Sequence, residues 1–308
     1  MQQTPKIQKT HGQVTSALKK EAKKLGKNTN DVYNQFFREV FLHALMEHHK
    51  GWVLKGGSNI YCRIPGARQT KDLDLYRQDD PTSSSEAADS LVRSMQGHKV
   101  GPYTFHVTRA EQVGPVGTIE SERINVTIIH GVGSRLTSFK VDVSGDLEVT
   151  DSVEPLVVAA SYSISSELLP PKFRVYSYPV ANQIADKVCA MYERHGNIPP
   201  GNASTRYHDL YDVALIAREL TVTASSLHTA LHEQRQVRRM TLPQKLILPD
   251  ASWTIQYPKK AKNFGDKRWG LDVLDEALRV AGLLLDPILN GEMREANRTW
   301  DCESLLWK

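Results

Sequence analysis

The sequence predicts an α+β protein, in which a region rich in strands is followed by a region rich in helices. Apolar and polar residues alternate in three runs with the period of half-buried strands, at 103–108, 124–130 and 139–143. Apolar residues recur instead at helical spacing before residue 50 and again after residue 179. The change of pattern near 170–180 predicts a first domain at 1–175 and a mainly helical lobe at 176–308.

The first fifty residues predict two helices separated by a break at 26–30. The first helix is basic, because it carries Lys19, Lys20, Lys23, Lys24 and Lys27. Asp31 is expected to cap the second helix, whose apolar residues recur every three or four positions.

Shorter elements follow in the predicted first domain. A strand is expected at 52–54, a helix through Ile60 and Tyr61, and a further helix at 86–96. The segment H-G-V-G-S-R at 130–135 has two glycines between strand-like runs, so we expect a hairpin turn there rather than a nucleotide-binding loop.

Composition limits the class of protein. The chain has 308 residues, of which 40% are hydrophobic, and no apolar run approaches the ~20 residues of a membrane span. The N-terminal segment lacks the apolar core of a signal peptide. Its three cysteines form no C-x-x-C pair, which argues against a disulfide framework or structural zinc. We therefore expect a cytoplasmic protein with no membrane partner, whose net charge of +4 permits a polyanionic partner.

The segment 53–76 holds the most informative motif. Gly56, Gly57 and Ser58 directly follow an apolar run, and Asp72 and Asp74 come a short loop later. In a strand, residues two apart point to the same face, so both carboxylates would share a face while the leucines between them face the core. Two carboxylates beside a glycine turn that can approach phosphate are typical of metal-assisted phosphoryl transfer. Ser58 would hold a phosphate at a helix N-terminus, or serve as a plain helix cap.

Other acidic and basic residues have both a functional and an ordinary interpretation. Asp142 alternates with two valines, so it is either a third acid of the site or a simple outward-facing aspartate. Lys187 lies among apolar residues of a predicted helix, where a lysine usually extends to solvent. Asp209 and Asp212 match acids that complement the dipole at the start of a helix.

Three basic stretches, at 19–27, 235–239 and 259–268, could follow a nucleic-acid backbone. The last of them has aromatic neighbours that suit base stacking or ordinary packing. Runs of charge are more often solvated faces, so both interpretations stay open.

Four segments resemble conserved blocks of a known family. V-L-K-G-G-S at 53–58 and R-Q-T-K-D-L-D-L at 68–75 are followed by I-A-D-K-V-C-A-M at 184–191 and R-Y-H-D-L-Y-D-V at 206–213. In this order they resemble the AbiEii/AbiGii-type nucleotidyltransferase toxins, which include the MenT toxins. The resemblance covers most of residues 30–290. It implies a polymerase-β-like nucleotidyltransferase core with a mixed sheet, and a helical C-terminal lobe that completes the active site.

The resemblance also implies roles for individual residues. Asp72, Asp74 and Asp142 would bind Mg²⁺, with Mn²⁺ as the alternative, and Lys187 and Asp209 would complete the catalytic set. The nucleotide would be bound by Lys187 together with Lys55, Gly56, Gly57, Ser58 and Arg68. His208 stands where the family commonly has a lysine or arginine, a place that Arg206 could take.

The function implied by the resemblance is that of a toxin. The enzyme would transfer a nucleoside monophosphate from an NTP to the 3′ acceptor end of tRNA, which blocks aminoacylation, translation and growth. A cognate antitoxin protein would be its partner. Two alternatives remain, namely transfer to a protein hydroxyl of the antitoxin or of the chain itself, and a module that binds NTP or RNA without catalysis.

Overall fold

The chain folds into two compact units in the computed structural model. The structure describes residues 10–78, 83–110, 121–145, 149–162, 164–196, 201–265, 267–293 and 297–308. The first unit consists of the chain up to Arg63, Thr70–Leu147 and Glu154–Ser177. The second consists of Ile64–Gln69, Glu148–Val153 and Tyr178–Lys308. The chain therefore leaves the first unit twice before it enters the second for good at Tyr178.

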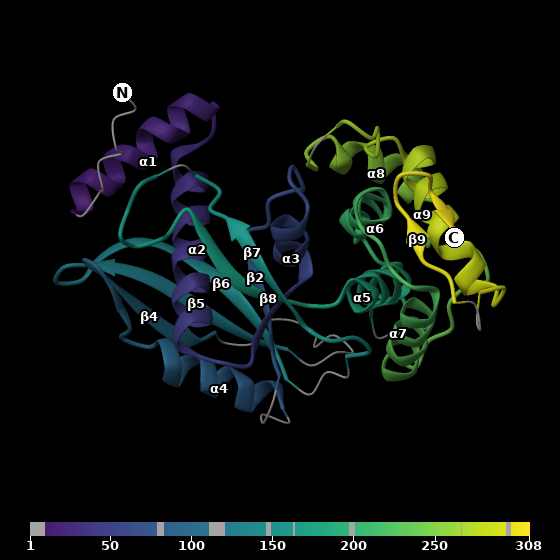
Figure 1. Cartoon of the computed structure of the whole chain (residues 1–308), viewed down its shortest axis with the longest axis horizontal. Helices are drawn as coiled ribbons and strands as arrows, with labels where there is room; N and C mark the ends of the chain where they lie inside the picture. Colours follow the sequence, from purple (N-terminus) through teal and green to yellow (C-terminus); the bar gives the residue numbers. More distant parts are fainter. Residues whose placement is uncertain are drawn as a thin grey trace. The chain divides into compact units, whose positions relative to one another are not determined.

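The first unit combines helices with one mixed sheet (Figure 1). Its helices in the described residues are α1 (His11–Leu25), α2 (Thr29–His48), α3 (Gly56–Arg63) and α4 (Ser84–Met95). Its strands there are β1 (Trp52–Lys55), β2 (Leu73–Arg77), β3 (Lys99–Val100), β4 (Tyr103–Arg109), β5 (Glu122–His130), β6 (Ser134–Ser144), β7 (Glu154–Ala159) and β8 (Lys172–Ser177).

The order of strands in the sheet is β3-β4-β5-β6-β2-β1-β8-β7. β2 runs parallel to β6, and β1 runs parallel to β8, whereas the other neighbouring pairs are antiparallel. Segments far apart in the sequence are thus neighbours at the centre of the sheet. The predicted α+β class is confirmed.

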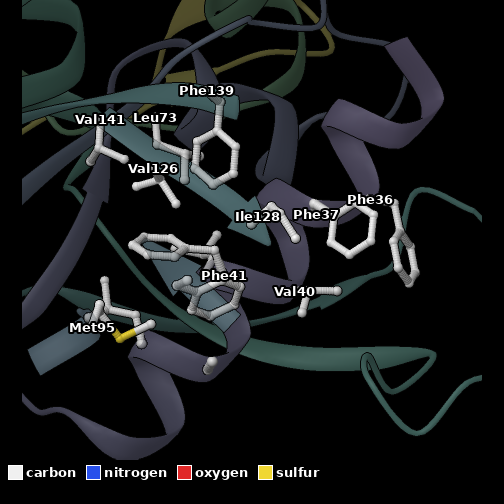
Figure 2. Close-up of a cluster of buried hydrophobic side chains, with 14 of the residues drawn as sticks. Phe36, Phe37, Val40, Phe41, Leu73, Met95, Val126, Ile128, Phe139 and Val141 are labelled. Atoms are coloured by element: carbon white, nitrogen blue, oxygen red, sulfur yellow. The ribbon is translucent and has the colours of Figure 1, made fainter. Parts of the chain in front are cut away.

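One face of this sheet is covered by α2 and α4, which share a single hydrophobic core with it. Figure 2 shows Phe37, Val40 and Phe41 of α2 lying against the apolar residues of β5 and β6, with Met95 of α4 beside them. The Phe41 ring meets Phe139 edge to face, with 5.6 Å between ring centroids. Because side chains alternate along a strand, the residues between these core positions point to the opposite face of the sheet.

The ends of the N-terminal helices have local causes. Thr10 caps α1 by a capping box with Gln13, and Gly26 ends this helix in the left-handed conformation at φ 62°. Asn28 caps α2, because its side chain accepts a hydrogen bond of 2.8 Å from the backbone N–H of Asn30. The expectation that Asp31 is the cap was wrong. Asp31 lies in the first turn, where its charge suits the helix dipole.

The predicted turn between β5 and β6 is confirmed. These strands form an antiparallel hairpin whose connection lies at residues 131–133, and both glycines there have positive φ. Ser83 caps α4 by a second capping box with Glu86, so the helix begins two residues before the predicted start.

The second unit is mainly helical in its described residues. Its elements are α5 (Val180–Tyr192), α6 (Tyr207–Glu219), α7 (Ala224–Val237), α8 (Trp253–Ala261), α9 (Leu274–Leu289), β9 (Trp300–Asp301) and β10 (Leu306–Trp307). Helix α6 is buried along most of its length and packs against α5, α8 and α9. No helix in the described part of the chain is both long and apolar enough to cross a membrane.

Buried tryptophans anchor the second unit. The Trp253 indole N–H donates a hydrogen bond of 3.0 Å to the carbonyl of Ser204, and the Trp300 indole N–H one of 2.7 Å to the carbonyl of Ala217. Each ring therefore buries its apolar surface without leaving its polar atom unsatisfied.

Candidate active site

Asp74 and Asp142 are neighbours because β2 and β6 pair in parallel. The two residues are register partners in this ladder. Leu73 and Leu75 on β2, like the valines beside Asp142, belong to the hydrophobic core. Both carboxylates consequently lie on the opposite face of the sheet, on strands that are about 4.8 Å apart. Asp72 lies immediately before the first residue of β2.

Gly56 gives the Asp74 carboxylate its space. Lys55 ends β1 as the register partner of Asp74, and Gly56 follows with φ at +65°. A Cβ on Gly56 would lie 2.0 Å from Oδ2 of Asp74, which is far inside van der Waals contact. Glycine is required here twice, for the backbone conformation and for the close approach of the carboxylate. The Gly-Gly-Ser segment is the first turn of α3, in which Gly57 is buried.

Ser58 ties α3 to the loop that enters β2. Its hydroxyl lies 2.7 Å from the hydroxyl of Thr70 and donates a hydrogen bond of 3.1 Å to the carbonyl of Asp72. The Thr70 hydroxyl reaches the same carbonyl at 3.0 Å. Because α3 begins at Gly56, Ser58 lies inside the helix, and its interpretation as a helix cap was wrong. Ser58 instead fixes the backbone at Asp72, while its N–H belongs to the first turn, where N–H groups have no acceptor within the helix.

Arg38 of α2 also binds the loop that enters β2, and the sequence analysis did not identify it. This α2 residue is only 7% exposed, and its guanidinium donates hydrogen bonds of 2.7 Å to the carbonyl of Lys71 and 2.6 Å to the side chain of Gln35. Burial lowers the pKa of Arg38, although the carboxylates of Asp72 and Glu39 oppose this shift. The available signal was that Gln35, Arg38 and Glu39 flank or interrupt the apolar residues at 36–37 and 40–42 of this helix.

Arg123 binds Asp142 and was also missed. It is the register partner of Asp142 on the other side of β6, in β5. Its Nε lies 2.7 Å from Oδ1 of Asp142, and its Nη2 lies 2.9 Å from Oδ2. This two-point hydrogen bond raises the pKa of Arg123, with smaller contributions from the charges of Asp72 and Asp74. No local pattern could show this pair, because it depends on the strand register.

The donor atoms on this face fit a magnesium ion. Mg²⁺ prefers oxygen ligands and is usually held by one or two carboxylates together with waters and substrate phosphates. Asp74 and Asp142 supply such a pair. Within the residues that the structure describes, no group of three or more His, Cys, Asp or Glu side chains is placed to hold a metal. That Asp72, Asp74 and Asp142 all bind the metal therefore stays a prediction.

A second charged cluster lies within the second unit. Lys187 on α5 places its Nζ 2.8 Å from Oδ1 of Asp209 and 2.6 Å from Oδ2 of Asp212, both on α6. The side chain of Lys187 is 5% exposed and those of the two aspartates are 0% and 1% exposed. The ordinary interpretation of Lys187 was therefore wrong, because this lysine does not extend to solvent. Asp209 does lie in the first turn of α6, as expected for an acid that complements the helix dipole, and it is in addition buried against Lys187. Asp209 and Asp212 are three residues apart, so they share one face of α6.

Two arginines complete this cluster. Arg68 donates from Nε and Nη2 to the two oxygens of Asp212, at 2.9 and 2.7 Å. Arg206 donates to Oδ2 of Asp209 at 2.5 Å. Burial opposes ionisation of Asp209, but Lys187 and Arg206 outweigh it and hold its pKa below the ordinary value. Three cations then face two carboxylates, which leaves this cluster with a net positive charge.

His208, which stands where the family commonly has a lysine or arginine, does not act as a cation beside Asp209. Its Nε2 lies 3.5 Å from Oδ1 of Asp209, but burial lowers the pKa of His208 to about 4. It is therefore neutral at pH 7, and the cations beside Asp209 are Arg206 and Lys187.

The predicted site residues thus form two groups, each within one unit. The first unit contains Lys55, Gly56, Gly57, Ser58, Asp72, Asp74 and Asp142. The second contains Arg68, Lys187 and Asp209, together with Asp212, which joins Arg68 to Lys187.

Comparison with known proteins gives the family. Residues 40–275 match the family described as "Nucleotidyl transferase AbiEii toxin, Type IV TA system". The chain belongs to this family. Membership makes it a nucleotidyltransferase of a toxin–antitoxin system, which implies an NTP substrate and an antitoxin partner.

Two solved structures resemble this chain. The MenT4 nucleotidyltransferase toxin of Mycobacterium tuberculosis is 16% identical with a TM-score of 0.48, over 91% of this chain and 88% of its own. The JHP933 protein of Helicobacter pylori is 12% identical with a TM-score of 0.45, over 86% of this chain and 93% of its own. No curated protein matches the sequence.

We expect Gly56→Ala to reduce nucleotidyl transfer far more than Gly97→Ala. Both glycines have positive φ, of +65° and +76°, so each alanine costs about 1–2 kcal/mol of backbone strain. A Cβ at Gly97 meets nothing within 4 Å, whereas at Gly56 it displaces the Asp74 carboxylate. Transfer activity and hydrogen exchange of β1 and β2 measure the difference. Equal losses in the two variants would show that the contact with Asp74 is unimportant.

Lys187→Met should destabilise the second unit by about 3 kcal/mol, because it leaves two buried carboxylates with reduced compensation. Arg279→Met is the control. It removes an exposed ion pair with Glu276 in the same unit and should cost less than about 1 kcal/mol. Four of the five tryptophans lie in this unit, so tryptophan fluorescence during urea unfolding is a suitable measurement. Similar losses in both variants would contradict a buried ionic cluster.

The stability of the second unit should fall as the pH decreases from about 6.5 to 4.5. The pKa of His208 is about 4 in the folded chain and 6.5 in the reference state, so the unfolded chain binds more protons in this window. The side chain is 35% exposed, so solvent reduces the size of the effect. His208→Gln should flatten the fall, whereas His195→Gln, at an exposed histidine, should not. Identical pH profiles of His208→Gln and the unmodified chain would refute this assignment.

Proposed function

We propose that this AbiEii-family chain transfers a nucleoside monophosphate from an NTP to the 3′ end of tRNA and so blocks aminoacylation and translation. The observation that carries the proposal is the pairing of Asp74 with Asp142 beside Gly56 and the first turn of α3. It supplies two carboxylates and a set of backbone N–H groups on one strand–helix junction, which are what a metal–triphosphate substrate needs.

The proposed reaction is an in-line displacement. The 3′-hydroxyl oxygen forms a bond to the α-phosphorus, the bond between the α-phosphorus and the bridging oxygen breaks, and pyrophosphate leaves. Asp74, Asp142 and Asp72 would hold Mg²⁺, which when bound lowers the pKa of the hydroxyl and neutralises developing charge.

The chain's own residues orient this site. Ser58, Thr70 and Arg38 fix the backbone that leads into β2, and Gly56 leaves room for the Asp74 carboxylate. Fixed positions matter because catalysis by such enzymes is mainly positioning and electrostatic stabilisation. A role for Lys187, Arg68 and Asp209 toward the phosphates stays a prediction from the family resemblance.

The proposal of tRNA as acceptor is supported by the surface of α1. Its face toward the core is formed by Val14, Leu18 and Ala22, which are buried. The lysines at 19, 20, 23 and 24, with Lys27 just after the helix, are all exposed. A row of exposed lysines on one helix suits a phosphate backbone, and its contribution would weaken as the salt concentration rises.

The test is transfer of label from α-labelled NTPs to total tRNA in the presence of Mg²⁺. We expect labelled tRNA, a loss of about 10³-fold in Asp74→Asn, and full activity in Asp89→Asn, which alters an exposed carboxylate of α4 in the same unit. Periodate oxidation of the tRNA 3′ end should abolish labelling, and labelled tRNA should no longer accept its amino acid.

Other outcomes would overturn the proposal in different ways. Label found only on polypeptide would make a protein hydroxyl the acceptor. Mg²⁺-dependent binding of NTP without transfer to RNA or protein would indicate a binding module. Transfer that survives periodate treatment would exclude the 3′ end as the acceptor.

A further inference from the structure

Arg123 occupies both oxygens of one of the carboxylates predicted to bind metal. Its Nε and Nη2 lie 2.7 and 2.9 Å from the two oxygens of Asp142. The pair follows from the register of β5 and β6, in which the two residues are directly opposite each other. This fork-to-fork geometry is the strongest form that an arginine–carboxylate contact takes.

Arg123 lies in the electrostatic field of all three aspartates that are predicted to bind metal. Asp72, Asp74 and Asp142 can carry three negative charges, and each of them stabilises the charged form of Arg123. The arginine side chain is 48% exposed and that of Asp142 is 24% exposed. Arg123 is therefore held by its carboxylate partner, is about half exposed to solvent and does not belong to the hydrophobic core.

We propose that Arg123 is a positioning residue that holds Asp142 in place before a divalent cation binds, and that it competes with the cation for this carboxylate. The competition is physical. A cation that takes an Asp142 oxygen as a ligand shares it with, or displaces, a guanidinium of the same sign of charge. The inference rests on the proposed function, because a metal-dependent site is what gives Asp142 a second partner.

Arg109, on the neighbouring strand, is a suitable control because it pairs with carboxylates that are not predicted to bind metal. It lies on β4 and pairs with Asp89 at 3.0 Å and with Glu122 at 3.1 Å. Its side chain is 37% exposed, comparable with Arg123, but neither of its partners is a predicted metal ligand. Arg109→Gln thus removes the same type of group from the same sheet while leaving Asp142 with its arginine.

The test is the affinity for Mn²⁺ of the full chain without nucleotide, measured by the electron paramagnetic resonance signal of the free ion. Arg123→Gln should bind Mn²⁺ about tenfold more tightly than the unmodified chain, because a competing positive charge is removed. Arg123→Lys keeps the charge but not the two-point geometry, so its affinity should fall between the two. Arg109→Gln should leave the affinity unchanged.

A double variant shows whether the effect passes through Asp142. In an Asp142→Asn background, adding Arg123→Gln should change Mn²⁺ affinity by much less than tenfold, because the contested carboxylate is gone. An effect of Arg123→Gln that is equally large in this background would assign it to the general field of the arginine and overturn the competition for Asp142.

The remaining outcomes separate the inference from the proposed function. Unchanged or weaker Mn²⁺ binding by both Arg123→Gln and Arg123→Lys overturns the inference, while transfer of label to tRNA by the unmodified chain would still support the function. Absence of Mn²⁺ binding in the unmodified chain and in every variant overturns the inference together with the metal dependence.

Discussion

The candidate active site depends on the parallel pairing of β2 with β6. This pairing sets Asp74 beside Asp142, and its register also fixes the face on which Asp74 lies, since a shift of β2 by one residue would turn that carboxylate toward the core. The core residues on the other face of β2 and β6 therefore stabilise both the fold and the register of these two strands. Stability and site geometry arise here from the same contacts.

Around this pair, several residues restrict the chain without belonging to the chemistry. Arg38 and Ser58 bind backbone carbonyls at Lys71 and Asp72 from two different helices, so the loop before β2 is held from two sides. Buried charge at Arg38 is tolerated because its partners satisfy the guanidinium. Such support lets a loop residue such as Asp72 be positioned almost as well as a residue within the strand.

The local sequence pattern predicted which strand residues face outward, and it contained the motifs of the family. It did not predict the partners of the charged residues. Alternation placed Asp74 and Asp142 outward, as found, because it depends on neighbours in sequence. Arg123 was missed because its partner depends on the register of another strand. Lys187 shows the same limit, since only the packing of α5 on α6 buries it against Asp209 and so overrides the usual preference of lysine for solvent.

The order of strands has a consequence for when the protein becomes able to act. Asp74 acquires its neighbour only after β6 has been synthesised, and β1 gains its parallel partner only when β8 emerges, up to Ser177. Contacts between such distant segments form slowly and late. A nascent chain on the ribosome, or a fragment that stops before β6, would thus lack the paired carboxylates. This topology therefore delays formation of the paired carboxylates until the chain has been made through β6, which ends at Ser144.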